Sequence, residues 1–563
     1  MRTILPLFLI IGLASGTQGL ADGETVRQQI PQWIQQLGDE SFLVRQRAEM
    51  LLIRAGIQAY SELQRAKQSH DVEIVRRAEH VLSQIEQTLL DSENRDAAYL
   101  IQLYTAAPEP VSKARILWCL ADPVPTLFYE KYTYEKGFEK GEGLQTLCRL
   151  VRFEENSSLR LEAAKTLIAS PPVLPVQRQK WYQYIRDTFF DPGGNELIQC
   201  LAHYANLWCD LNDADEKRTP AFQERVRETG AETLRLLEKP ENNIQIGSGV
   251  DILLHYAVAE IQDTAGLTAE RDETVSRALA IQPQPIQTSE LIQLIGGLEE
   301  GQAMNEHRRV GQYLKMRCRL RWGMAHFQRV IETGDILIRI QACAAAAETA
   351  LLTHDYSAAA DFWDKYIEIH NSPEYTKDYD PSRAILIAQR QKTYCLAAKV
   401  ASEGNWAGVR DIFGQTPVFP IAAVLMDDME LIILAYRLCS QLPDIDSEFK
   451  NAVETSLKQM WQVIVLEYES LHEARWERTP EYCNAAAWLL ANTDGDYPSA
   501  LTLIEAALKS EPDNATYLDT LAHVYFLGGR IDEAVRIQEQ VVRMAPEGII
   551  FQKALERFQQ AKN

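Results

Sequence analysis

The stretch YLDTLAHVYFLGGRIDEAVRIQEQVVRMAP, residues 517–546, has the pattern of two helices joined by a turn. Apolar residues recur at helical spacing, and the small residues Ala522 and Ala534 stand where the two backbones can cross closely. The Gly-Gly pair at 528–529 ends the first helix, and Pro546 ends the second. The stretch therefore predicts a helical hairpin and carries no group suited to catalysis.

Two further segments follow the same pattern. They are NAAAWLLANTDGDYPSALTLIEAALKSEP at 484–512 and, more weakly, QACAAAAETALLTHDYSAAADFWDKYIEI at 341–369. These units resemble the tetratricopeptide repeat (TPR), although Gln538 and Val541 stand where that family prefers an aromatic residue and Ala. The resemblance implies stacked hairpins whose first helices line a concave, peptide-binding groove.

The N-terminal part repeats a different pattern. FLVRQRAEMLLIRAG (42–56) and EIVRRAEHVLSQI (73–85) share residue types thirty positions apart, and SSLRLEAAKTLIASPP (157–172) is a third copy. In each copy an Ala permits close approach while branched residues fill the seam. These segments resemble HEAT repeats, with Asp39 and Asp71 in the turns before the second helices.

Strand patterns are scarce, so we predict an all-α fold, an α-solenoid of stacked hairpins that are HEAT-like and then TPR-like. GIIFQKALERFQQ (548–560) is apolar on one face and is expected to cap the open end. The predicted organisation is a signal peptide at 1–21, HEAT-like repeats at 22–90, an irregular helical region at 91–301, divergent TPR-like repeats at 302–475, two TPR units at 476–546 and a capping helix at 547–563.

The N-terminus has the features of a secretory signal peptide. Arg2 precedes a short apolar segment at 4–13, and the small residues Gly19 and Ala21 stand before Asp22. A buried helix or an uncleaved anchor are alternatives, but the segment has about half the roughly 20 residues that span a bilayer. We expect cleavage near Gly19–Ala21 and a mature chain exported to the periplasm or cell envelope, without membrane insertion. The whole arrangement resembles uncharacterised exported bacterial TPR proteins, with YDPSRA (379–384) and ATYLDTLAHVYF (515–526) carrying that likeness.

Charge and cysteine content restrict the function further. The 563 residues hold 57 Lys plus Arg against 79 Asp plus Glu, a net charge of −22, which disfavours nucleic acid as the main partner. None of the nine cysteines forms a C-x-x-C pair. Cys200 and Cys209 share one expected helix at about 13 Å along its axis, too far apart for a disulfide. Most cysteines fit buried apolar positions, and one or two bridges between neighbouring helices remain open.

A search for catalytic and metal-binding patterns gives no site. His472-Glu473 lacks the second His of a zinc-protease motif, Gly247–Gly249 lacks the nucleophile-elbow pattern, and DPGGN at 191–195 lacks the Lys of a phosphate loop. We therefore predict no catalytic residue, no metal and no cofactor.

Two groups of residues are candidates for partner binding. By the TPR family's spacing, Asn484 and Trp488 in one unit and Asp519 and His523 in the next should face the groove, with Trp488 as an aromatic anchor. A core position is an equal alternative for Trp488. The second group is a basic patch that would meet an anionic partner or acidic helices of the same solenoid, at Arg309, Arg317 and Arg321, the last two expected one turn apart on one helix.

The expected function is a non-catalytic exported scaffold that binds protein or peptide partners on the concave face of the solenoid. The alternative is a cell-envelope enzyme or glycan-binding accessory protein with its site in 91–301. That region is rich in aromatic and charged residues, as in WYQYIRDTFF at 181–190. A deep cleft lined by Trp181 and Tyr182 would favour this alternative, and a continuous groove would favour the scaffold.

Overall fold

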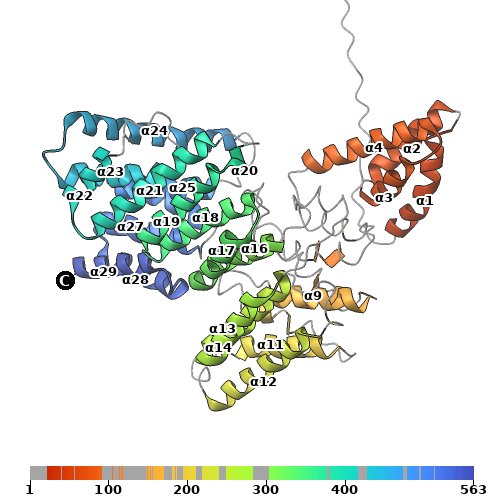
Figure 1. Cartoon of the computed structure of the whole chain (residues 1–563), viewed down its shortest axis with the longest axis horizontal. Coiled ribbons are helices and arrows are strands. Elements are labelled where there is room, and N and C mark those ends of the chain that lie inside the picture. The colour runs from red at the N-terminus through yellow and green to blue at the C-terminus, as the bar shows by residue number, and fades with distance from the viewer. Residues whose placement is uncertain are drawn as a thin grey trace, which may run out of the picture. The chain divides into compact units, whose positions relative to one another are not determined.

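The structure is a computed structural model, and its described secondary structure is helical, without a strand (Figure 1). It divides into two compact units, residues 1–116 and 117–563, which we treat separately. Apart from scattered positions inside these ranges and further positions between 104 and 186, the described residues are 22–91, 156–169, 195–210, 219–239, 242, 249–282, 303–376, 381–415, 428–472, 479–510 and 512–562. The predicted signal peptide at 1–21 lies outside them.

The described part of the first unit, residues 22–91, consists of two stacked helical hairpins. Its helices are α1 (Asp22–Gln36), α2 (Phe42–Ala55), α3 (Ile57–Ala66) and α4 (Val72–Asp91). α1 packs on α2 and α3 on α4, while α1 also contacts α3 and α2 contacts α4. Ala48 and Ala78, the matched alanines of the two repeats, are fully buried where the helices meet. The segments predicted to be HEAT-like repeats therefore form helical hairpins in this unit.

Polar residues of the same repeat fix the stacking of these hairpins. Arg77 Nη1 lies 2.5 Å from Glu49 Oε2 and so joins α4 to α2. The Asp71 carboxylate accepts hydrogen bonds from the backbone N–H of Glu73 and Ile74, which is the N-cap role of an aspartate at a helix start.

The second unit begins with helices in the region predicted to be irregular. They are α9 (Ser157–Ala169), α11 (Glu196–Asp210), α12 (Pro220–Leu237), α13 (Gly249–Thr264) and α14 (Thr268–Ala280). α13 is buried along almost its whole length, because it packs on α9, α12, α14 and the following α16. Thr219 caps α12 and Pro220 stands at its first turn. The described parts of this region are thus regular helices, while the predicted domain boundaries stay predictions.

The rest of the second unit is a continuous series of helices (Figure 1). They are α16 (Ala303–Met316), α17 (Leu320–Thr333), α18 (Ile336–Leu352), α19 (Tyr356–His370), α20 (Pro373–Thr376), α21 (Ser382–Ser402), α22 (Trp406–Gln415), α23 (Met429–Gln441), α24 (Ser447–His472), α25 (Thr479–Asn492), α26 (Tyr497–Ser510), α27 (Ala515–Leu527), α28 (Ile531–Met544) and α29 (Ile549–Lys562). From α23 on, each helix packs on the next described one, and α23, α25 and α27 also contact one another in turn. This is the arrangement of a solenoid built from hairpins.

The hairpin at 517–546 forms as its sequence predicts. Asn514 caps α27, Gly529 takes the positive φ of 73° in the turn, and Ala522 and Ala534 are fully buried between α27 and α28. α29 then packs on α28 and buries Phe558 completely, which confirms the capping helix. None of the described helices is both long enough and apolar enough to cross a bilayer.

One helix prediction is wrong. Arg317 and Arg321 do not share a helix, because α16 ends at Met316 and α17 begins at Leu320. Between them Cys318 takes a positive φ of 56°, a left-handed turn conformation that ends α16. Such a turn usually carries Gly or Asn, so a Cys at this position does not signal a helix end.

Candidate functional site

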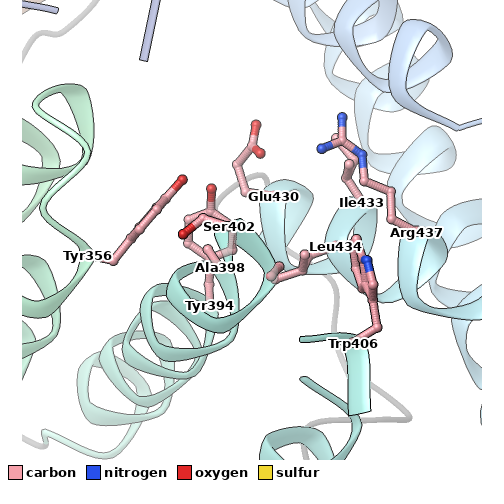
Figure 2. A pocket seen from close by; sticks show the side chains of 10 residues that line it. Tyr356, Tyr394, Ala398, Ser402, Trp406, Glu430, Ile433, Leu434 and Arg437 are labelled. Atoms are coloured by element: carbon pink, nitrogen blue, oxygen red, sulfur yellow. The ribbon is translucent and has the colours of Figure 1, made fainter. Parts of the chain in front are cut away.

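A cavity of about 220 Å³ lies where α19, α21, α22 and α23 meet (Figure 2). Its walls combine three aromatic side chains, small residues and two opposite charges. The lining residues are Tyr356, Tyr394, Ala398, Ala401, Ser402, Trp406, Glu430, Ile433, Leu434 and Arg437. This volume lies below the roughly 300–1,000 Å³ of small-molecule sites, so the cavity fits a group about the size of one side chain.

Helix starts position two of the aromatic side chains. Tyr356 is the first residue of α19, which Asp355 caps by accepting a hydrogen bond from Ala358 N at 3.0 Å. Trp406 is the first residue of α22 and follows a turn in which Gly404 has a φ of 76°. Tyr394 comes from the middle of α21. Three helices of the array, α19, α21 and α22, therefore each bring one ring to the cavity.

The two charged residues come from α23 and are held by α25. Figure 2 shows both side chains extending from α23 into the upper part of the view, above Trp406. Trp488 Nε1 donates a hydrogen bond of 2.6 Å to Glu430 Oε1, and Arg437 donates to Asn492 Oδ1. Because these partners are one turn apart on α25, the next hairpin fixes the positions of both charges.

The protonation states follow from burial and charge. Burial raises the pKa of Glu430, while the hydrogen bond from Trp488 and the charge of Arg437 act in the opposite direction. Burial also raises the pKa of Tyr356 to about 12 and that of Tyr394 well above its usual range. Both phenols are therefore neutral at ordinary pH and can donate hydrogen bonds into the cavity.

A row of rings continues from this cavity toward the C-terminus. Trp488 on α25, His523 on α27 and Phe558 on α29 follow one another at 35-residue spacing. Their ring centroids are 4.8 Å apart for the first pair and 5.0 Å for the second, both edge to face. Together with Glu430, these side chains form a series that links α23 to α29, and we call it the ring row.

The predicted groove residues lie in or beside the ring row, and their role in binding stays a prediction. Asp519 and His523 each have 8% of their surface exposed, whereas Asn484 and Trp488 are partly buried. The Asp519 carboxylate accepts a hydrogen bond of 2.7 Å from Gln538 Nε2, which also donates to the Phe551 carbonyl. Gln538, the departure from the TPR pattern noted above, thus links α27 to α29.

Burial shifts the pKa values of these two residues in opposite directions. It raises the pKa of Asp519 to about 7 and lowers that of His523 to about 3. His523 Nδ1 donates to the Asp519 carbonyl at 2.9 Å, which fixes the neutral ring. When Asp519 is protonated and His523 is neutral, both side chains pack against their neighbours and expose no charge to solvent.

The predicted basic patch is wrong as an exposed surface. Arg317 forms a buried ion pair with Glu260 of α13, and Arg309 has only 3% of its surface exposed. Of the three predicted residues only Arg321 is exposed, at the start of α17. The acidic partner of Arg317 comes from α13, while the helix expected to supply it, around 290–300, lies outside the described residues.

Trp181 and Tyr182, the two aromatic residues named for a cleft of the alternative function, belong to the core. Trp181 and Tyr182 are 3% and 1% exposed, Trp181 Nε1 donates to the Leu167 carbonyl, and Tyr182 stacks on Trp208 at 5.4 Å. At this burial neither ring presents an exposed face on which a sugar could stack. Among the described residues, no group of three or more His, Cys, Asp or Glu side chains is placed to hold a metal ion.

The comparisons with known proteins give only structural likenesses. No protein-family model matches the chain, and no curated protein matches it. Similar solved structures include yeast Tom70 (15% identical, 96% of both chains covered, TM-score 0.23), the Cut9–Hcn1 hetero-tetramer of the APC/C (11%, 96% of both, 0.23) and the TPR domain of P58(IPK) (10%, 90% of this chain and 97% of that one, 0.19). At these identities and TM-scores they carry no argument about function.

The packing of its helices defines the class of protein to which the chain belongs. The chain is an all-α helical-repeat protein, and its C-terminal hairpins resemble TPRs. Sequence reasoning selected Trp488 but missed Glu430, Arg437 and the three aromatic residues of the cavity. One sequence signal for the cavity was available, because Tyr356 and Trp406 each stand at the first position of the second helix of a hairpin.

Proposed function

We propose that this chain is a non-catalytic exported scaffold that binds a protein partner through its helical solenoid. The observation that carries the proposal is the cavity between α19 and α23, where aromatic side chains surround two fixed, opposite charges. Partly exposed Tyr and Trp side chains are the groups that most often anchor protein interfaces, since they bury a large area at low entropic cost. The size of the cavity suits one anchoring side chain of such a partner.

Export is part of the same proposal and rests on the N-terminal sequence. The charged start, the short apolar segment and the small residues before Asp22 form the pattern of a cleaved signal peptide. Mass spectrometry of the protein recovered from the producing cell tests this step. We expect an N-terminus at or near Asp22, whereas an intact Met1 on the folded protein would contradict export by cleavage.

Affinity capture with two tryptophan variants tests the scaffold function. Trp406→Ala removes one wall of the cavity, while Trp461→Ala removes an exposed Trp of α24 that does not line it. We expect partner proteins to be recovered by the wild type and by Trp461→Ala but lost with Trp406→Ala, at unchanged helicity. Equal recovery by both variants would show that the cavity is not the binding site.

A further inference from the structure

We propose that the cavity recognises a basic side chain, a lysine or an arginine, of the protein partner. This inference rests on the proposed function and specifies what the cavity binds. It starts from Glu430, whose Oε1 accepts from Trp488 while Oε2 has no hydrogen-bond partner among the described residues. One carboxylate oxygen is therefore available at the wall of a cavity that the chain itself does not fill.

The aromatic lining favours a cation in the same place. Tyr356, Tyr394 and Trp406 surround the space next to this carboxylate. Aromatic faces attract ammonium and guanidinium groups, and the attraction is stronger where water is excluded. The hydroxyl groups of both tyrosines also have no hydrogen-bond partner among the described residues and can accept from a cation.

Among the lining residues that the structure describes, Arg437 is the one whose charge opposes a cation, and its contacts limit this effect. Its guanidinium already donates to Asn492 on α25, so part of its hydrogen-bonding capacity is used within the protein. Burial raises the pKa of Glu430, and the charge of Arg437 acts against that rise. An anionic ligand would instead meet the Glu430 carboxylate, the negative faces of the rings and a chain of net charge −22.

The size of the cavity points to a side chain as the ligand. A cavity of about 220 Å³ lies below the roughly 300–1,000 Å³ of sites for drug-sized ligands, so it suits a single Lys or Arg side chain better than a cofactor. The apolar stem would lie on Ala398 and Leu434, and the charged end would reach Glu430.

Selection of peptides from a random heptapeptide library on the full chain tests the inference. Glu430→Gln keeps an oxygen for Trp488 but removes the charge, and Glu505→Gln makes the same charge change on an exposed position of α26. We expect Lys or Arg to be enriched at one peptide position with the wild type and with Glu505→Gln, and this enrichment to disappear with Glu430→Gln.

A double-mutant cycle on one selected peptide then measures the contact directly. Replacing its basic residue by Gln is expected to weaken binding about 10- to 100-fold in the wild type and hardly at all in Glu430→Gln. Arg437→Gln, which removes the opposing charge, should tighten binding of the basic peptide a few-fold.

The outcomes separate the two proposals. Peptides that bind and are lost with Trp406→Ala, but carry no basic position or show no coupling to Glu430, would overturn the basic-ligand inference alone. If the wild type selects no peptide at all while it captures partners through Trp406, the inference also fails and the scaffold stands. Absence of both peptide selection and partner capture would overturn the two together.

Discussion

Asp519 provides a test of the ring row at the level of one side chain. Its pKa is raised to about 7 in the folded state from an ordinary value of 3.8, so the folded chain holds a proton that the unfolded chain has lost between about pH 4 and 7. The free energy of unfolding contributed by this group therefore falls as pH rises through that window. Asp519→Asn keeps the acceptor for Gln538 and cannot ionise. We expect it to stabilise the protein at pH 8 by on the order of 2 kcal/mol and much less at pH 5, as read from thermal unfolding.

His523 contributes to the pH dependence of stability with the opposite sign, and this contribution has to be separated from that of Asp519. Its pKa is lowered to about 3 from 6.5, so this group destabilises the folded state as pH falls from 6.5 toward 3. Because the wild type and Asp519→Asn share His523, the difference between their unfolding free energies isolates the carboxyl group. A difference that does not change between pH 5 and pH 8 would mean that Asp519 is ionised and solvated in the folded protein.

Two buried histidines give a second residue-scale prediction. His307 Nε2 must donate to the Ile281 carbonyl at 3.2 Å, so its Nδ1 accepts from His326 Nδ1 at 2.8 Å and both rings are neutral. Burial lowers the pKa of His307 to about 4 and lowers that of His326 well below its ordinary value. In the unfolded chain both take up protons near pH 6.5, so stability should fall as pH drops from 6.5 toward 4. The protection of α16 and α17 against hydrogen exchange, corrected for the intrinsic pH dependence of exchange, should fall over this range more in the wild type than in His326→Gln.

At the scale of elements, the crossing of α16 and α17 depends on two glycines. A Cβ at Gly323 would lie 2.9 Å from the Gly311 carbonyl oxygen, and one at Gly311 would lie 2.7 Å from the Phe327 ring. We expect Gly323→Ala to force the helices apart and to cost about 1–3 kcal/mol. Gly414→Ala in α22 is the matched control, because no atom lies within 4 Å of its Cβ position and Ala favours a helix. Chemical denaturation that shows equal stability for both variants would contradict this account of the crossing.

The helices were predictable from sequence where their signals were local. Ala522, Gly529 and Pro546 define the C-terminal hairpin because helix crossing and helix ends depend on residues a few positions apart. The cavity was not predictable in this way. Glu430 and Tyr356 belong to different hairpins, and no local sequence pattern marks either of them. Only the stacking of the hairpins brings them to the same cavity. The same holds for Arg317, since its buried partner Glu260 lies on α13 and not in a neighbouring turn.

At the scale of the whole second unit, the end of the helical array returns to its own earlier helices. α29 contacts α18 as well as α28, and the Glu547 carboxylate accepts a hydrogen bond of 3.0 Å from Arg321 N at the start of α17. The array from α17 to α29 therefore closes on itself, and α29 both ends the ring row and covers part of α18. Closure of this kind restrains the opening of the solenoid, because separating the hairpins would also break these contacts.

Removal of α29 tests this closure. A chain ending at Ala545 loses Phe558, which packs on Phe526 at 4.7 Å and on His523, and it also uncovers α18. We expect hydrogen exchange to accelerate in α27 and, although they are far away in sequence, in α17 and α18. Glu547→Ala is the milder control, since loss of one cap costs about 0.5–2 kcal/mol and should affect only the first turn of α17. If the truncated chain exchanges faster in α27 and α28 but unchanged in α18, the array is an open solenoid and α29 serves as a cap alone.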